Sequence, residues 1–159
     1  MIAFLLISAL YFADIFLRAS LKTFWYDELF TVFLCRLPSF HATWAAVIAG
    51  TDLNPPLFYL LTRWGQHFFG EGLIATRLPA ILGVWVFCIC ILVFVNRRLG
   101  PLYGCVAALF PLFTLAHTYA YEARPHGCVL GWCGLMLVCW QRARQGRSLS
   151  WWTLALGLC

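Results

Sequence analysis

Residues 73–95 form a nearly unbroken apolar run, which only Arg77 and Pro79 interrupt near its start. A helix needs about 20 mostly apolar residues to cross a bilayer, so this run is long enough for one span. The whole chain is also apolar, because 63% of its residues are hydrophobic and only 11% are charged. Soluble domains are about 45–50% apolar and about 25% charged. This composition excludes a soluble enzyme and a disordered chain, and it predicts an all-α integral membrane protein.

Four further apolar segments predict the other spans of a polytopic helix bundle. They cover residues 1–17, 102–119, 121–140 and 149–159. The first has neither a basic start nor a small-residue cleavage site, so we expect a retained membrane helix rather than a signal peptide. The last is too short to complete a span. We therefore expect residues 1–159 to be the N-terminal part of one larger membrane domain.

The first two predicted spans are separated by residues 18–72, which contain only short apolar segments. Residues 30–37 and 42–49 are too short to cross a bilayer. Residues 55–69 have helical spacing of apolar residues on one face, but they also contain Arg63, which is costly within lipid. A helix lying flat at the membrane surface avoids that cost. We expect residues 18–72 to form one outer loop with interfacial helices.

Arginine residues predict the orientation of the bundle. Arg97 and Arg98 lie in one short loop, a second loop contains three more arginines, and neither loop contains an acid. The three are Arg142, Arg144 and Arg147. Cytoplasmic loops are enriched in basic residues, so both loops are predicted to be cytoplasmic. The N-terminus is then cytoplasmic, and residues 18–72 and 119–127 face the outside of the cell membrane.

The acidic pair Asp27 and Glu28 follows the aromatic residues Trp25 and Tyr26, which suit the membrane interface. One interpretation is helix capping, because Asp is a preferred N-cap and Glu favours the first turn. The other is catalysis, with a carboxylate at the membrane surface that takes a proton from an acceptor hydroxyl. The residues themselves leave both interpretations open.

Arginines near the same outer face are candidate phosphate ligands. Arg124 follows Glu122 closely in the predicted outer loop, where the two residues either form a salt bridge or leave Arg124 to bind phosphate. Arg77 lies at the outer end of its helix. It can snorkel to the surface, pair with Glu71 or bind a lipid phosphate.

A rigid corner, Asn54, Pro55 and Pro56, precedes the helix predicted over residues 55–69. Proline is well placed at a helix start, so a purely architectural role is one interpretation. The other is that the corner shapes a site on the outer face.

Five motifs in this order resemble the GT-C class of membrane glycosyltransferases. Within that class they are similar to the dolichyl-phosphate-mannose protein mannosyltransferase and aminoarabinose transferase group (glycosyltransferase family 39-like). The resemblance covers roughly residues 20–130. The motifs are the Asp27–Glu28 pair, the Asn54 to Leu61 run, Phe69 to Glu71 with Thr76 to Pro79, Asn96 to Gly100, and Tyr121 to Pro125.

This resemblance implies transfer of a sugar from a polyprenyl-phosphate donor to a protein, lipid or glycan acceptor on the outer face. It implies that Asp27 is the catalytic base and that Glu28 is its neighbour in the site. The remaining implied positions are Arg124, Glu122 and Arg77 near the donor phosphate and Asn54, Pro55 and Pro56 as site-shaping residues.

A divalent metal is the one candidate cofactor, and no metal ligand is assigned. Asn54 departs from the His or acidic residue that the family often places before the two prolines. We expect membrane lipid as a partner. Nucleic acid is not expected, because no basic run is interleaved with exposed aromatics.

Two other functions fit a polytopic chain. A transporter component would place ionisable groups near the bilayer midplane, whereas residues 83–95 and 102–116 contain no charge. A non-catalytic scaffold or lipid-binding subunit would explain the spans but not the outer acids and arginines. We expect this stretch of chain to be inactive by itself.

Overall fold

The computed structural model describes residues 2–144 together with residues 151, 153, 154 and 157. Most of the predicted segment 149–159 therefore lies outside the described residues. In the described part every regular element is helical. The α-helices are α1 (Ile2–Leu21), α2 (Tyr26–Cys35), α3 (Phe40–Ile48), α4 (Pro56–Phe69), α5 (Leu73–Leu99), α6 (Pro101–Leu109) and α7 (His126–Ala143). Two 3₁₀ helices, η1 (Phe110–Phe113) and η2 (Leu115–Tyr121), lie between α6 and α7.

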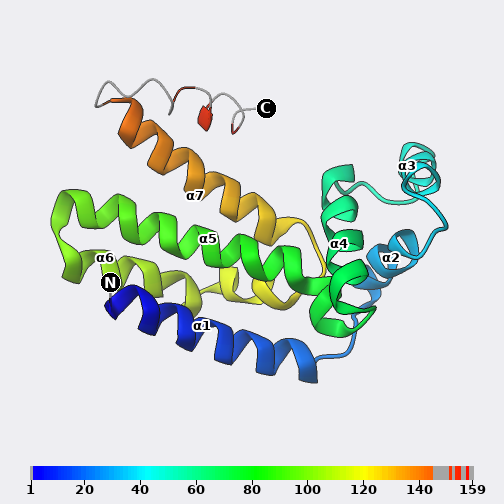
Figure 1. Ribbon diagram of the computed structural model, residues 1–159, viewed down its shortest axis with the longest axis horizontal. Helices are drawn as coiled ribbons and strands as arrows, with labels where there is room; N and C mark the ends of the chain where they lie inside the picture. The colour runs from blue at the N-terminus through cyan, green and yellow to red at the C-terminus, as the bar shows by residue number, and fades with distance from the viewer. Residues whose placement is uncertain (1, 145–150, 152, 155–156, 158–159) are drawn as a thin grey trace.

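Helix α5 is the centre of the bundle, and it contacts α1, α4, α6, α7 and η2. Figure 1 shows α1, α6 and α7 running alongside α5, while α2, α3 and α4 gather at one end. The chain turns sharply at the opposite end of α5 because Gly100 adopts a φ of 93° and Pro101 begins α6. Glycine tolerates this backbone conformation, and proline suits the first position of a helix. The shorter helices are therefore collected at a single end of the bundle.

Two helices are long and apolar enough to cross a membrane, namely α1 over Phe4–Leu21 and α5 over Leu73–Leu99. The segment expected as a straight span over residues 102–119 is instead bent by 73° between Pro101–Phe113 and Leu115–Tyr121. Pro111 lies in η1, where its missing N–H interrupts the α-helical hydrogen bonds. The following helix begins at His126 rather than near residue 121, because η2 and a short loop occupy the intervening chain.

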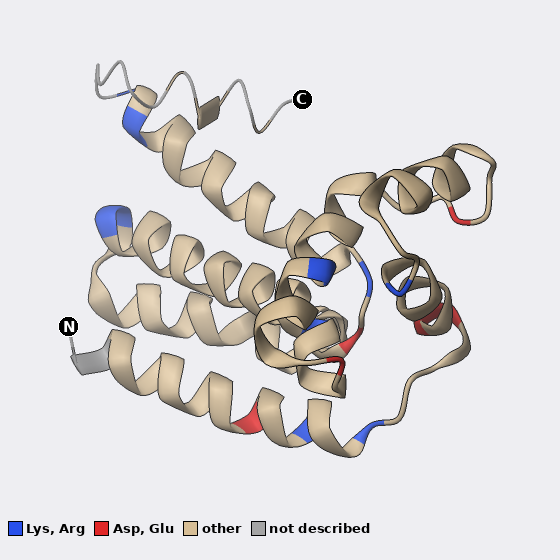
Figure 2. Ribbon diagram, turned by 45° about the vertical axis from the view of Figure 1, so that its right-hand side comes forward, with Lys and Arg blue, Asp and Glu red and all other residues tan. Residues whose placement is uncertain are grey.

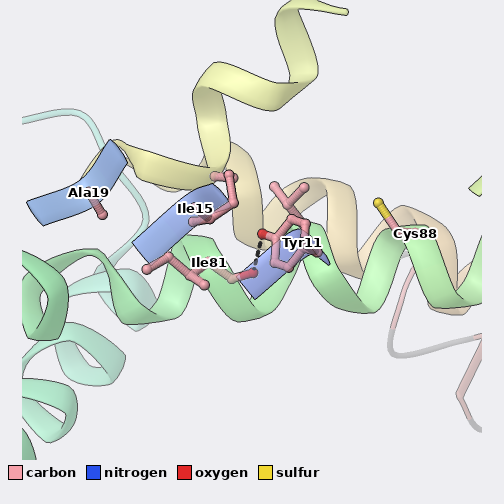
Figure 3. Packing of buried hydrophobic residues seen from close by; sticks show 7 residues of the cluster. Tyr11, Ile15, Ala19, Ile81 and Cys88 are labelled. Atoms are coloured by element: carbon pink, nitrogen blue, oxygen red, sulfur yellow. Dashed lines mark hydrogen bonds between the residues drawn. The ribbon is translucent and has the colours of Figure 1, made fainter. Parts of the chain in front are cut away.

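A buried cluster joins α1 to the middle of α5. It consists of Tyr11, Ile15, Ala19, Ile81, Val84, Cys88 and Ala120. The hydroxyl of Tyr11 donates a hydrogen bond to the carbonyl oxygen of Ile81 at 2.7 Å (Figure 3). This bond satisfies the buried hydroxyl, and it fixes the position of α1 along α5.

Helices α5 and α7 approach so closely that glycine is required at the contact. A Cβ on Gly83 would collide with the backbone of Gly127, and a Cβ on Gly131 would lie 2.8 Å from the carbonyl oxygen of Gly83. Small residues allow membrane helices to pack backbone to backbone. This contact anchors the start of α7, directly after the loop that contains Glu122 and Arg124.

Helix α4 turns its apolar face outward and its polar residues toward the protein. Leu57, Trp64 and Phe68 are exposed, whereas Gln66 is buried and donates to Thr76 of α5. Arg63 donates to backbone carbonyls at the end of α2, those of Cys35 and Leu37. The expectation that Arg63 lies among lipid headgroups is therefore wrong. Instead, its charge stabilises the C-terminal end of a neighbouring helix, where the helix dipole is negative.

Candidate active site

Glu28 lies in the first turn of α2, and its carboxylate is buried, with a side-chain exposure of only 1%. The backbone N–H groups of Trp25 and Ala123 donate to it at 2.9 and 2.6 Å. Arg77 donates from Nε to Oε1 and from Nη2 to Oε2, both at 2.9 Å. Burial raises the pKa of Glu28, but these hydrogen bonds and the charge of Arg77 outweigh it, so the pKa lies below its ordinary value. Glu28 is therefore an ionised carboxylate with both oxygens occupied.

Arg77, on α5, has no exposed side-chain surface, and all five of its N–H groups are used. Besides its two bonds to Glu28, it donates to three backbone carbonyls at the end of α1 and just after it. These are Ala19 and Lys22 at 2.7 Å and Thr23 at 3.2 Å. The ring of Phe24 lies 5.1 Å from its guanidinium carbon. No donor of Arg77 is left for a phosphate.

Neither alternative that the sequence leaves open for Arg77 describes its contacts. It does not pair with Glu71, which lies 3.1 Å from Arg36. It does not snorkel to the surface either, because its side chain is completely buried. The sequence carries no signal for its partnership with Glu28, because the two residues lie 49 positions apart.

Asp27, adjacent to Glu28, forms a different kind of ion pair. Its Oδ2 accepts from Nη1 of Arg124 at 2.9 Å, and both side chains are partly exposed. Within the described residues, Oδ1 of Asp27 accepts no hydrogen bond, and the buried Nε of Arg124 has no partner. The pair therefore retains a free carboxylate oxygen and free guanidinium donors.

Glu122 pairs with Lys22 rather than with Arg124. The Nζ of Lys22 lies 2.8 Å from Oε1 of Glu122 and 5.1 Å from the ring centroid of Tyr121. A salt bridge between Glu122 and Arg124 is therefore wrong for this loop. Lys22 is a site residue that the sequence reasoning missed, because nothing local predicts a contact across 100 positions.

A cavity of about 190 Å³ lies between the start of α2 and the loop before α7. It is lined by Trp25, Asp27, Glu28, Glu122 and Arg124. Four of the predicted site residues therefore surround one space, although they come from segments about 95 residues apart. Lys22 reaches Glu122 from the end of α1, and Arg77 lies behind Glu28.

The proline corner does not line this cavity. Asn54 donates to Oδ2 of Asp52 at 2.9 Å, and the hydroxyl of Tyr59 donates to the same oxygen at 2.6 Å. Pro55 caps the start of α4 and Pro56 is its first residue. Pro55 also lines a separate pocket with Pro125, the residue after Arg124. The corner thus contacts the loop that carries Arg124, but not the space beside it.

The chemistry available in the cavity is that of carboxylates and cations. In the described residues, no three His, Cys, Asp or Glu side chains gather as ligands for a metal ion. Asp27 and Glu122 each face a basic side chain instead. A carboxylate with a free oxygen beside a guanidinium with free donors can accept a proton and bind an anion at neighbouring points.

The family model described as dolichyl-phosphate-mannose-protein mannosyltransferase matches residues 53–159, which is more than half of the chain. The chain belongs to this family. It is therefore a membrane glycosyltransferase chain of the GT-C type, and the predicted family and all-α membrane fold are confirmed. Mannosyltransferases of this family use lipid-linked sugar donors. No curated protein and no solved structure matches the chain.

The family match includes Arg77, Glu122 and Arg124, but it begins after Asp27 and Glu28. The match and the motif resemblance over residues 20–130 therefore overlap only in part. The tertiary structure of this mannosyltransferase-family chain joins the two portions, since Asp27 bonds Arg124 and Glu28 bonds Arg77. The acidic pair is thus a neighbour of the family-matched segment in space.

Proposed function

We propose that this chain forms the catalytic cavity of an enzyme that transfers a sugar from a polyprenyl phosphate to a hydroxyl or amine acceptor. The cavity lies on the outer face of the cell membrane, with the N-terminus of α1 in the cytoplasm. The observation that carries the proposal is the Asp27–Arg124 pair, a partly free carboxylate bonded to a partly free guanidinium at one cavity. The family match supports the lipid-linked donor.

Asp27 is the proposed base. Its free Oδ1 accepts the proton of the acceptor group, whose oxygen or nitrogen then attacks the anomeric carbon of the sugar. The bond from that carbon to the phosphate oxygen breaks, and polyprenyl phosphate leaves with the electron pair. Arg124 donates from its free N–H groups to the phosphate and stabilises the charge that develops on it.

The resting ion pair gives this mechanism a built-in order. While Arg124 donates to Asp27, it partly neutralises the base that the reaction requires. A donor phosphate bound by Arg124 competes with Asp27 for the same guanidinium. Donor binding is therefore expected to release the carboxylate for the acceptor, and removing the Asp27 charge is expected to favour donor binding.

Glu28 and Arg77 are proposed to position the cavity rather than to react in it. Glu28 binds the backbone of Trp25 on one side and Ala123 on the other, so it fixes the spacing of the chain segments that carry Asp27 and Arg124. The phosphate contact expected for Arg77 is not retained in this proposal, because its donors are all occupied. Lys22 provides a second cation beside Glu122 at the cavity rim.

The test is Asp27→Asn in the full-length protein, assayed for both sugar transfer and binding of polyprenyl phosphate. We expect transfer to fall by about 10²–10⁴-fold, the usual contribution of a general base. Donor binding should be retained or strengthened, because Arg124 loses its charged competitor. Glu71→Gln is the matched control, since Glu71 is an exposed acid outside the cavity, and it should transfer normally.

Wild-type transfer by the Asp27→Asn protein would refute the base assignment. A non-catalytic scaffold or a transporter component predicts that outcome together with no transfer activity above background in the wild type. Loss of both transfer and donor binding would instead indicate that Asp27 supports the cavity structurally.

A further inference from the structure

Charge is distributed unequally between the two ends of the bundle. Every Asp and Glu of the chain lies on α1 or near the end that carries the cavity, and the ends of α5 and α7 carry arginine only (Figure 2). Arg77 and Arg97 are twenty residues apart on α5, or about 30 Å along a helix, which equals the thickness of the hydrocarbon core. If Arg77 lies at one membrane surface, these arginines therefore lie at the headgroup level of the other.

Two of these arginines gather at one aromatic ring. The guanidinium carbon of Arg98, on α5, is 5.6 Å from the ring centroid of Trp140, and that of Arg144, after α7, is 5.3 Å from it. Arg98 also lies 5.3 Å from the ring of Phe94. Neither guanidinium has an ion pair or a hydrogen bond to any described residue. Two cations are thus held at one indole without a counter-charge.

This arrangement favours an anion. Like charges held close together repel each other, and a bound anion turns that repulsion into attraction. Contact with the ring uses the face of a guanidinium and leaves its N–H groups at the edge, where a phosphate can accept two of them. No carboxylate of the chain is available for this role, because no Asp or Glu follows Glu122 and none lies between Glu71 and Glu122.

The surface beside these arginines is apolar. Leu99 and Leu102 are 64% and 72% exposed, and Tyr103 between α5 and the middle of α6 is exposed as well. A soluble anion would leave these side chains in water. A lipid would place its phosphate at the arginines and its acyl chains over the leucines, while tyrosine suits the interface between the two.

We propose that Arg98 and Arg144, both over Trp140, bind the phosphate of an anionic membrane phospholipid at the surface opposite the catalytic cavity. The site holds α5 and α7 together at their far ends, where the glycine contact near Gly83 no longer does so. It is independent of the sugar-transfer proposal, because none of its residues lines the cavity.

The experiment titrates the purified full-length protein in neutral detergent with phosphatidylglycerol, and with phosphatidylcholine for comparison, and it counts bound lipid by native mass spectrometry. We expect the wild type to prefer phosphatidylglycerol. The double variant R98Q/R144Q should bind it about 30-fold more weakly, from about fivefold for each arginine. Trp140→Leu keeps both charges but removes the ring, and it should also weaken binding.

The matched control is R97Q/R142Q, which removes the same charge from the same two helix ends. Neither residue lies over the ring of Trp140, so this variant should lose less than about fivefold. Equal losses in the two double variants would overturn the site in favour of diffuse attraction. Equal binding of both lipids by the wild type, or displacement of phosphatidylglycerol by millimolar inorganic phosphate, would overturn the choice of a lipid ligand.

Discussion

Two ion pairs made by adjacent acidic residues differ in everything except their chemistry. Glu28 and Arg77 are buried, and every oxygen and N–H of the pair has a protein partner. Asp27 and Arg124 are partly exposed, with one hydrogen bond between them and unused groups on both sides. A saturated pair can hold backbone in place but cannot bind a substrate. The half-used pair can bind substrate, and it depends on the saturated pair for its geometry.

The sharpest way to break this comparison is to remove Arg77. Arg77→Met leaves the Glu28 carboxylate buried without its charge partner and leaves three backbone carbonyls without a donor. Removing one partner of a buried pair costs about 3–5 kcal/mol, so we expect a large drop in the midpoint of thermal unfolding. The drop is measured on purified protein in detergent.

Arg36→Met is the control for that measurement, because Arg36 pairs with Glu71 at the exposed surface. Exposed pairs contribute about 0–1 kcal/mol, so this variant should unfold close to the wild type. Equal effects of the two substitutions would contradict the structural role assigned to Arg77.

Acid should weaken the buried pair. The pKa of Glu28 in the folded protein lies below its ordinary value of 4.5, so the carboxylate binds its proton more readily in the unfolded chain. Its stabilisation is therefore present in full above about pH 4.5 and is lost as the pH falls through the lower folded-state pKa. Thermal unfolding followed from pH 6 to pH 3 measures this loss. Glu28→Gln should be less stable at pH 6 and should show a shallower decline.

Arg124→Lys sharpens the comparison with the smallest change. It keeps the positive charge near Asp27 but replaces the planar fork by a single ammonium group, which cannot bind phosphate in the same bidentate way. We expect about tenfold weaker binding of polyprenyl phosphate and little change in unfolding temperature. Arg36→Lys is the control and should leave donor binding unchanged. An unaltered affinity in Arg124→Lys would argue against its phosphate role.

Much of the architecture follows from local sequence. The apolar run at residues 73–95 predicts the central helix, which extends over Leu73–Leu99. The proline pair predicts the start of α4, and Asp14 bonds Arg18 one turn later, as their spacing of four predicts. These features depend on hydrophobic period, backbone restriction and neighbours within one turn, all of which the sequence carries directly.

Local sequence was a poorer guide to which side of a helix faces the protein. The apolar face of α4 predicted an interfacial helix with Arg63 in the headgroups, but in the structure this face is outward and Arg63 bonds the end of α2. In a membrane protein both lipid and protein interior are apolar, so an apolar stripe does not tell which of the two it meets.

The sequence by itself determined that this chain is an all-α membrane protein with acids and arginines at a few fixed places, and its motifs indicated the family. Only the tertiary structure decided which of those charges are available for chemistry. Glu28 and Asp27 are adjacent in the chain, yet one is saturated and the other retains free groups. The physical reason is that burial and hydrogen-bond partners come from segments 49 to 97 positions away, and no local pattern encodes them.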